Sequence, residues 1–341
     1  MTQSRGKLGI MACNSGRAFA DEVVRHLGVI YERKGIADGF KYVVSEEVHF
    51  ANGEVKTVVH EPIRGYDLYV IQLMDDPLAS YTVNDNLMAL ATAINAAYNS
   101  DVESVTAVIP QFPNSRQERR KGRESLTAAM VAQFLEECGA SRVLTIDIHA
   151  EAIVGFFRKA RLDNLHASKE IIKYLYEKSL ITPSTVVVAP DVGSAETARY
   201  YSRELKCDMA MVIKERDYSK PSTVVSTRLV GTVKDRDVLI IDDMIATGGT
   251  LIAACKTLKE FGAHRIDVAV TFPFFNGEAV QKIDAAWKEG ILTTVAGTNA
   301  VWRGRKFAEE HPWYYEVDVT RLFAEVLYRV NHMKSVSELL V

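Results

Sequence analysis

Two adjacent carboxylates after an apolar run, followed by a Thr-Gly-Gly-Thr sequence, are the residues whose types and spacing most directly suggest chemistry. The apolar run spans residues 238–241, and Asp242 and Asp243 follow it. The second part of the motif consists of Thr247, Gly248, Gly249 and Thr250. Paired carboxylates can accept hydrogen bonds from two neighbouring hydroxyl groups, such as the 2,3-diol of a ribose. The motif therefore predicts a sugar-binding loop.

The glycine pair predicts a phosphate site beside these carboxylates. Glycine lets the backbone approach a ligand closely and adopt dihedral angles that other residues avoid. A periodic apolar segment over residues 251–261 predicts a helix that begins here, and the N-terminus of a helix attracts phosphate. One loop could thus bind both ends of ribose 5-phosphate. The alternative is an acidic strand end with a simple glycine turn, but the full string is more specific than a bare Thr-Gly-Gly.

Two cations follow a predicted strand over residues 209–213. Lys214 and Arg216 have the same parity on this strand, so they point to the same side. Two cations that face one site would neutralise charge on a transferring phosphoryl group. A surface charge cluster with Glu215 and Asp217 is the alternative.

A longer run of cations follows a predicted strand over residues 105–109. Gln117 lies within the run, whose cations are Arg116, Arg119, Arg120, Lys121 and Arg123. Guanidinium groups bind phosphate oxygens through paired hydrogen bonds, so this run predicts polyphosphate binding. A solvated loop is the alternative.

A histidine and an aspartate also end predicted strands. His149 follows residues 143–148, with Asp147 nearby, and Asp191 follows residues 186–189. Ligands of open α/β sheets bind at the carboxyl ends of strands, which favours a functional role for both. A structural histidine and a helix cap by Asp191 stay open as alternatives.

Strand-like and helix-like segments alternate through most of the chain, which predicts an α/β protein with mainly parallel sheets. An Asn-Gly turn between residues 42–50 and 55–60 predicts a hairpin that carries Phe50 and Glu54. Asn84 and Ser125 are the expected caps of two helices, the second of which should stop at Gly139. The polar residues 217–226 predict a mobile flap.

The length of 341 residues predicts two domains. Residues 64–72 and 234–242 have similar patterns, and each is followed by a helix and then by a strand that contains Ala-Val. This similarity favours two related α/β domains. The shared pattern of any two buried strands is the alternative.

Composition excludes several classes of protein. The net charge of −3 argues against a general nucleic-acid binder. The four cysteines are scattered without a Cys-x-x-Cys pair, which predicts buried thiols in a reducing compartment. No uncharged apolar run of about 18 residues occurs, so we expect no membrane segment. These features predict a cytoplasmic protein.

Together these segments resemble the ribose-phosphate diphosphokinase, or phosphoribosyl diphosphate (PRPP) synthetase, family over nearly the whole chain. The motifs that carry the resemblance are Val83–Met88, Pro113–Arg120, Asp147–Ala150, Gly155–Phe157, Ala189–Gly193, Lys214–Arg216 and Asp242–Thr250. Their order and spacing are highly specific in combination.

The resemblance implies two phosphoribosyltransferase-type domains, each a mainly parallel sheet flanked by helices. Residues 1–160, joined by 312–341, would form the N-terminal domain, and residues 161–311 the other. The implied reaction transfers the β,γ-diphosphate of Mg-ATP to the 1-hydroxyl of ribose 5-phosphate, which gives PRPP and AMP. A homo-oligomer, typically a hexamer, is also implied.

The resemblance further implies a role for each candidate residue. ATP would be bound by Phe50, Asn52, Glu54, Arg116 and Gln117. A Mg²⁺ ion would be bound by His149 and Asp191, and the catalytic cations would be Lys214 and Arg216. Ribose 5-phosphate would be bound by Asp242, Asp243, Thr247, Gly248, Gly249 and Thr250. Positioning and charge stabilisation suffice for such a phosphoryl transfer.

Three positions depart from the usual motifs of the family. Asn52 replaces an aspartate in the hairpin, Glu118 replaces an aspartate after Arg-Gln, and Ala246 replaces the aspartate before Thr-Gly-Gly. They bear on nucleotide selectivity, metal use and rate. An active synthetase is the leading hypothesis. The alternatives are a catalytically weak regulatory homologue that assembles with true synthetase subunits, and a phosphoribosyltransferase that consumes PRPP.

Overall fold

The computed structural model describes residues 4–216 and 224–340, apart from the side chains within 214–227 and those of Glu338 and Leu340. The described chain forms two compact units. The first contains the chain up to His166, Ala300–Trp302 and the C-terminal segment from Val319. The second contains Ala167–Asn299 and Arg303–Asp318.

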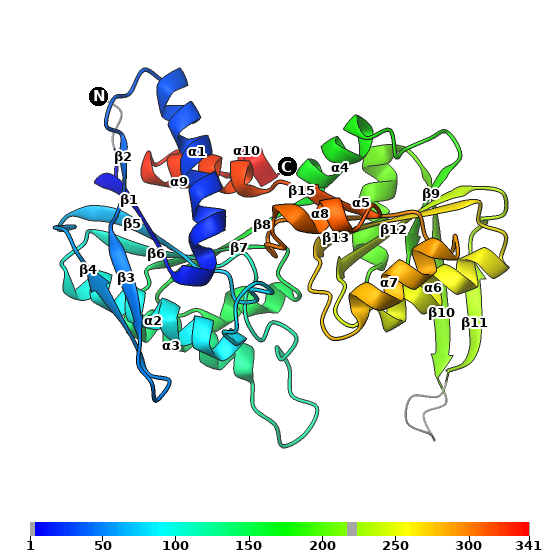
Figure 1. Cartoon of the computed structure of the whole chain (residues 1–341), viewed down its shortest axis with the longest axis horizontal. Helices are drawn as coiled ribbons and strands as arrows, with labels where there is room; N and C mark the ends of the chain where they lie inside the picture. The colour runs from blue at the N-terminus through cyan, green and yellow to red at the C-terminus, as the bar shows by residue number, and fades with distance from the viewer. Residues whose placement is uncertain (1–3, 217–223, 341) are drawn as a thin grey trace. The chain divides into compact units, whose positions relative to one another are not determined.

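The sheet of the first unit has the strand order β2-β1-β5-β6-β7-β8, and its neighbouring strands are parallel (Figure 1). These strands are β1 (Lys7–Ala12), β2 (Phe40–Tyr42), β5 (Tyr66–Ile71), β6 (Ser104–Val108), β7 (Arg142–Ile146) and β8 (Arg161–Leu165). One face is covered by α1 (Arg17–Arg33) and α9 (Thr320–Asn331), and the other by α2 (Val83–Asn99) and α3 (Thr127–Cys138). Short elements are η1 (Asn14–Gly16), η2 (Glu151–Phe156) and α10 (Ser337–Leu340).

A separate antiparallel hairpin of β3 (Ser45–His49) and β4 (Val55–Val59) packs against α2. The hydroxyl oxygens of Thr57 and Thr92 lie 3.1 Å apart in this contact. The predicted first strand of the hairpin, residues 42–50, was wrong at its start. Tyr42 instead belongs to β2, and the amide of the buried Val43 donates to the carbonyl of Ile10 at 2.7 Å, which holds this part of the chain in the main sheet.

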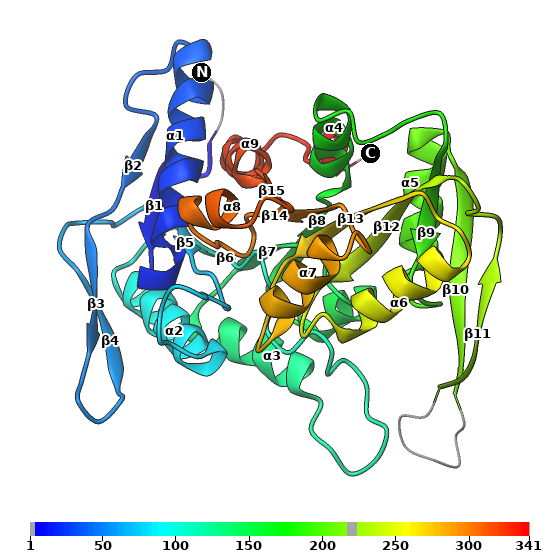
Figure 2. The same cartoon turned by 45° about the vertical axis from the view of Figure 1, so that its right-hand side comes forward.

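The sheet of the second unit has the strand order β11-β10-β9-β12-β13-β14-β15 (Figure 2). The strands are β9 (Thr185–Ala189), β10 (Asp208–Arg216), β11 (Val224–Val230), β12 (Asp237–Met244), β13 (Arg265–Phe272), β14 (Thr294–Thr298) and β15 (Tyr314–Val317). Among the described strand pairs of this second sheet, only β10 and β11 are antiparallel. The helices are α4 (Ser168–Glu177), α5 (Ala195–Leu205), α6 (Gly249–Glu260), α7 (Ala279–Lys288) and α8 (Arg305–Glu310).

Alternate residues of the central strands fill the two faces of this sheet. Val186, Val188, Val238 and Ile240 pack in one core with residues of α6 and α7, such as Cys255. Residues at the intervening positions are buried as well, as expected for parallel strands covered on both faces. The carboxyl ends of these strands therefore meet at one edge.

The two units repeat one strand order. Leaving β11 aside, β2-β1-β5-β6-β7-β8 corresponds to β10-β9-β12-β13-β14-β15. The similar segments 64–72 and 234–242 contain the equivalent strands β5 and β12, so the internal similarity reflects a repeated fold. The hairpin β3–β4 and strand β11 both belong to the connection that precedes this equivalent strand.

Two helix starts differ from the predicted ones. The cap of α2 is Thr82, not Asn84, because Thr82 and Asp85 form a reciprocal capping box. Helix α3 begins after Leu126 without a side-chain cap, so the prediction for Ser125 was wrong. Gly139 ends α3 with φ +114°, as predicted. Among the described helices, none is both long and apolar enough to cross a membrane.

Candidate active site

Strand β12 carries the paired carboxylates at its carboxyl end. Residues 237–241 are buried, whereas Asp242 and Asp243 are partly exposed. The strand continues through both aspartates to Met244, beyond the predicted end at Ile241, because Asp242 and Met244 still pair with β13. The end of the strand thus presents two carboxylates at the carboxyl edge of the sheet, which is where open α/β sheets bind ligands.

The loop after β12 offers backbone donors at the start of α6. Among the described residues, the amides of Thr247, Gly248, Gly249 and Thr250 donate to no protein acceptor. Gly248 adopts φ +73°, a conformation that favours glycine. An added Cβ on Gly249 would meet no atom within 4 Å, so open space adjoins these amides. Unbonded amides, a helix N-terminus and open space together suit a phosphate.

A segment after β13 braces this loop. The amide of Ile245 donates to the carbonyl of Phe272 at 2.9 Å, and the amide of Phe275 donates to the carbonyl of Ile245 at 3.0 Å. The amide of Asn276 donates to the carbonyl of Ala246 at 2.9 Å. Phe275 has φ +49°, which is unusual for a bulky residue, and its buried ring holds it there.

Asp191 and Asp242 come together at the same sheet edge, where β9 and β12 are neighbours. Ser194 lies between them. Its hydroxyl donates to Asp242 Oδ1 at 2.8 Å, and its amide donates to Asp191 Oδ1 at 3.2 Å. The side chain of Asp191 therefore turns toward the start of α5, and it also lies beside the carboxylate that the sequence assigns to the sugar.

The Asp242 carboxyl is held closer to neutrality than an ordinary aspartate. Burial raises its pKa, the nearby charges of Asp243 and Asp191 raise it further, and hydrogen bonds from Ser194 and the Asp243 amide offset part of the rise. The resulting pKa is about 7. Several carboxylates in one place form a centre of negative charge, which fits a divalent cation or a set of sugar hydroxyls.

Lys214 and Arg216 lie on β10, the strand next to β9. Their backbones pair with β11, with a shift of register between Glu215 and Arg216. Their side chains, which the sequence predicts to face one site, lie outside the described part of the structure. Most of the predicted flap lies outside it as well.

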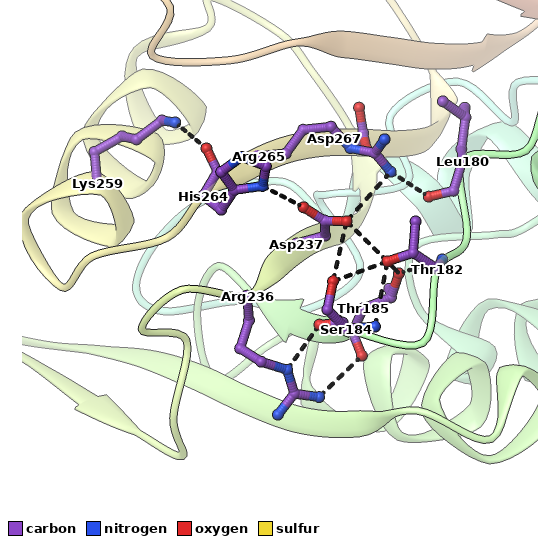
Figure 3. A network of polar contacts seen from close by, with 10 residues as sticks. All are labelled: Leu180, Thr182, Ser184, Thr185, Arg236, Asp237, Lys259, His264, Arg265 and Asp267. Carbon is purple, nitrogen blue, oxygen red and sulfur yellow. Dashed lines mark hydrogen bonds and ion pairs between the residues drawn. The ribbon is translucent and has the colours of Figure 1, made fainter.

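A polar network fixes the opposite, amino end of β12 (Figure 3). Asp237 accepts hydrogen bonds from the hydroxyls of Thr182 at 2.8 Å and Ser184 at 3.1 Å, and its other oxygen lies 2.9 Å from His264 Nδ1. Burial raises the pKa of Asp237, but these contacts outweigh that effect and leave it below the ordinary value. These contacts favour the charged form of Asp237 and anchor the amino end of the strand that carries the site.

In the first unit, the hairpin presents its turn residues to solvent. Phe50 is 44% exposed, and Lys56 Nζ lies 5.6 Å from the centre of its ring. Asn52 Oδ1 accepts the amide of Glu54 at 3.2 Å, so this side chain serves the turn. The exposed Phe50 ring and Glu54 carboxylate remain available to a ligand.

The predicted polyphosphate loop is an exposed stretch between β6 and α3. Arg116 and Gln117 are both exposed, and Gln117 is held by backbone hydrogen bonds to Asn114 and Ala128. Glu118 is turned inward, with Oε1 3.4 Å from Arg119 Nε. Its Oε2 is buried without a hydrogen-bond partner among the described residues, so the longer carboxylate at this position faces the protein.

His149 is exposed beyond the end of β7. Asp147, which precedes His149 by two positions, lies 3.1 Å from His166 Nδ1, at the end of β8. This hydrogen bond raises the pKa of His166. The structure thus brings Asp191 together with Asp242, and the hairpin, the cationic loop and His149 all belong to the first unit.

Two family models match the chain. The N-terminal domain of ribose phosphate pyrophosphokinase matches residues 8–139, and the phosphoribosyl transferase domain matches residues 160–303. A ribose-phosphate pyrophosphokinase of Helicobacter pylori (strain J99) is 34% identical over 339 residues, which cover 99% of this chain and 97% of the relative. The chain belongs to the ribose-phosphate pyrophosphokinase family.

Other members of the ribose-phosphate pyrophosphokinase family are similar over most of their length. Ribose-phosphate pyrophosphokinase A of Dictyostelium discoideum is 34% identical, covering 98% of both chains. The crystal structure of phosphoribosylpyrophosphate synthetase from Mycobacterium smegmatis matches with a TM-score of 0.81 and 28% identity, covering 95% of this chain and 98% of that one. The predicted fold class and enzyme family are confirmed, and these relatives support the synthetase rather than either alternative.

The sequence does not single out several site residues in this member of the pyrophosphokinase family. Ser194 could have been noticed because it stands three residues after Asp191, a spacing typical of capping. Phe275 and Asn276, which brace the sugar-phosphate loop, carry no signal in their residue types. His166, which follows β8 and pairs with Asp147, belongs to none of the predicted motifs.

Proposed function

We propose that this chain transfers the β,γ-diphosphate of ATP to the 1-hydroxyl of ribose 5-phosphate. The oxygen of that hydroxyl attacks the β-phosphorus, the bond from this phosphorus to the α,β-bridging oxygen breaks, and AMP leaves. The hydroxyl proton passes to solvent. The products are PRPP and AMP.

One observation carries this proposal. The unbonded amides of Thr247–Thr250 lie at the start of α6, and the same strand-loop-helix segment bears Asp242 and Asp243. In the proposed complex, the amides bind the 5-phosphate, and the carboxylates accept hydrogen bonds from the 2- and 3-hydroxyls. The sugar would then be held at both ends, leaving its 1-hydroxyl free to react.

The nucleotide is assigned to the first unit. The exposed Phe50 ring suits stacking on adenine, and Glu54 and the side-chain amide of Gln117 offer hydrogen bonds to it. Arg116 suits the polyphosphate. Asn52 contributes chiefly to the turn, since its carbonyl already accepts the Glu54 amide.

We assign Mg²⁺ to Asp191 and His149. Among the described residues, no group of three His, Cys, Asp or Glu side chains is arranged to hold a metal ion alone. Mg²⁺ typically binds through one or two carboxylates together with substrate phosphates and water, so the negative centre around Asp191 fits an ion that arrives with ATP. When bound, the ion would neutralise charge on the phosphates. Lys214 and Arg216 are assigned to the charge of the transferring group.

A direct assay tests the proposal. Purified protein incubated with ATP, Mg²⁺ and ribose 5-phosphate should form AMP and PRPP in equal amounts, measured by ³¹P NMR and by chromatography. A folded sample that forms neither product would refute it. Incubation with PRPP and each nucleobase tests the transferase alternative, for which we expect no turnover. Other nucleoside triphosphates would define the donor preference.

We further propose a cytoplasmic homo-oligomer, with a hexamer as the first expectation. Cys13 and Cys255 are buried free thiols, and Cys138 and Cys207 are partly buried, which fits a reducing compartment. Light scattering coupled to size exclusion measures the assembly, and a persistent monomer would contradict this part of the proposal. Co-purification with a second synthetase chain would instead favour the regulatory alternative.

A further inference from the structure

We propose that Ser194 is a positioning residue that couples cation binding at Asp191 to pentose binding at Asp242. This inference rests on the proposed function, because it takes Asp191 as a metal ligand and Asp242 as a sugar ligand. It assigns a role to a residue that neither the motifs nor the comparisons single out.

Ser194 is built into the sheet edge. It is 9% exposed and stands directly before α5. Its hydroxyl oxygen lies 2.8 Å from Asp242 Oδ1 and 3.4 Å from Asp191 Oδ1, and its amide nitrogen lies 3.2 Å from the same Asp191 oxygen. Gly193 permits this arrangement, since an added Cβ there would lie only 3.1 Å from Asp191 Oδ1.

A single hydroxyl proton cannot serve both carboxylates fully. The shorter contact shows that Asp242 receives most of it, and Asp191 competes for it at longer range. Each carboxylate keeps its Oδ2 without a protein partner among the described residues. These two oxygens are therefore the ones left for ligands.

Coupling follows from this shared proton. A cation bound to Asp191 attracts that carboxylate, which then no longer competes as a hydrogen-bond acceptor for the Ser194 hydroxyl. The hydroxyl therefore donates to Asp242 alone. Asp242 Oδ1 is then fixed by Ser194 and by the Asp243 amide at 3.0 Å, and Oδ2 is oriented toward the sugar hydroxyls. By linkage, a pentose on Asp242 must strengthen cation binding by the same factor.

The test measures ribose 5-phosphate binding by calorimetry, with Mg²⁺ and with excess chelator. In the unaltered protein we expect Mg²⁺ to tighten binding about tenfold, which is within the usual range of coupling between two sites. In S194A this factor should fall about fivefold, which corresponds to one hydrogen bond. S194C keeps the volume of the side chain but donates weakly, so it should behave like S194A, whereas S194T should restore the coupling.

S184A is the matched control. Ser184 also donates to an aspartate of β12, but at the amino end of the strand, where Asp237 is the acceptor (Figure 3). Its loss should change stability and leave the effect of Mg²⁺ on ribose 5-phosphate affinity unchanged.

The possible outcomes separate this inference from the proposed function. If the unaltered protein makes PRPP and S194A and S194C retain the full Mg²⁺ effect, the inference is wrong and the proposed function stands. If S184A lowers the coupling as much as S194A, the effect is a general consequence of destabilisation, and the inference is again wrong. If the folded, unaltered protein binds no ribose 5-phosphate, both proposals fail together.

Discussion

The amide of Asn276 donates to the carbonyl of Ala246 at 2.9 Å, so the backbone of the sugar-phosphate loop is held from the segment after β13. This contact does not involve the side chain of residue 246. The position where related synthetases usually carry an aspartate can therefore hold alanine without loss of the loop conformation. Its backbone is fixed by Asn276, and Ala246 itself is only partly buried.

Restoring the aspartate should therefore alter sugar binding and not folding. For A246D we expect a ribose 5-phosphate KM several-fold lower than that of the unaltered protein, because a carboxylate here can reach the sugar or its hydration shell. The thermal midpoint should change little, since the substitution is partly exposed and the brace is retained. Steady-state kinetics measures the KM, and calorimetry measures the thermal midpoint. An unchanged KM would mean that the site has adapted to alanine.

The two glycines of the loop should respond differently to alanine. G249A should leave stability unchanged or slightly raised, because a Cβ would meet no atom and alanine favours helix. It should weaken ribose 5-phosphate binding at least about tenfold, because the methyl group occupies the space beside the amides. G248A should cost stability of about 1 kcal/mol or more, since φ is +73°. Equal binding by G249A and the unaltered protein would place the phosphate elsewhere.

Lys214 should act on the transition state more than on sugar binding. For K214A we expect kcat to fall by roughly 10²- to 10³-fold, with ribose 5-phosphate affinity changed less than about threefold. Lys206, an exposed lysine at the end of α5, provides the control, and K206A should keep full activity. An equal loss of kcat and of ribose 5-phosphate affinity in K214A would show that Lys214 acts on sugar binding as much as on the transition state.

The contiguous part of the site could be predicted from the sequence. Residues 242–250 form one strand end, one loop and one helix start, so their order alone implies their geometry. Contacts between distant segments could not be predicted. The hydroxyl of Ser194 and Asp242 are 48 positions apart, and Phe275 reaches the loop through a backbone conformation that its residue type disfavours.

The fold was predictable where strands are buried on both faces. The central residues of β12 (238–241) and β13 (268–270) are apolar, and the sequence predicted a strand at each. Strand β8 was missed because Asp163 and Asn164 lie in it, as is common at the edge of a sheet. Its polar residues are satisfied by tertiary contacts, since Arg142 pairs with Asp163 and Asn164 accepts the Ile148 amide at 3.0 Å.

The raised pKa of Asp242 predicts a pH dependence of stability without divalent cations. Its pKa is about 7 in the folded protein and about 3.9 in the unfolded chain, so the folded state holds the proton more tightly. Stability should therefore decline as the pH rises from about 4 through 7. The D242N thermal midpoint should exceed that of the unaltered protein at pH 8, and the two should converge at pH 4.

Scanning calorimetry in chelator would measure this difference. D235N is the control, because Asp235 is exposed just before β12 and also tolerates asparagine in its left-handed conformation. The thermal midpoint of D235N should depend on pH in the same way as that of the unaltered protein. If the thermal midpoint of D242N does not exceed that of the unaltered protein at pH 8, the carboxylates at this edge do not repel one another as described.

Glu136 should show the opposite pH dependence. Its Oε1 accepts the amides of Arg158 at 2.8 Å, Lys159 at 2.6 Å and Ala160 at 2.7 Å, which holds the chain that returns from η2 to β8. Burial raises its pKa, but these amides and the Lys159 charge outweigh that effect, so its pKa lies below the ordinary value. Its stabilising contribution is thus present above about pH 4.5 and is lost as the pH falls through the lowered pKa.

We therefore expect E136Q to lower the free energy of unfolding by about 1–3 kcal/mol at pH 7, because a neutral amide accepts these hydrogen bonds more weakly than a carboxylate. Urea unfolding at pH 7 and pH 4 should show the difference shrinking in acid. E137Q is the matched control: Glu137 pairs with Lys159 at 2.7 Å, but its side chain is 72% exposed, so its loss should cost less than about 1 kcal/mol at either pH. A penalty for E136Q that persists at pH 4 would mean that the side chain stabilises the turn by packing and not by its charge.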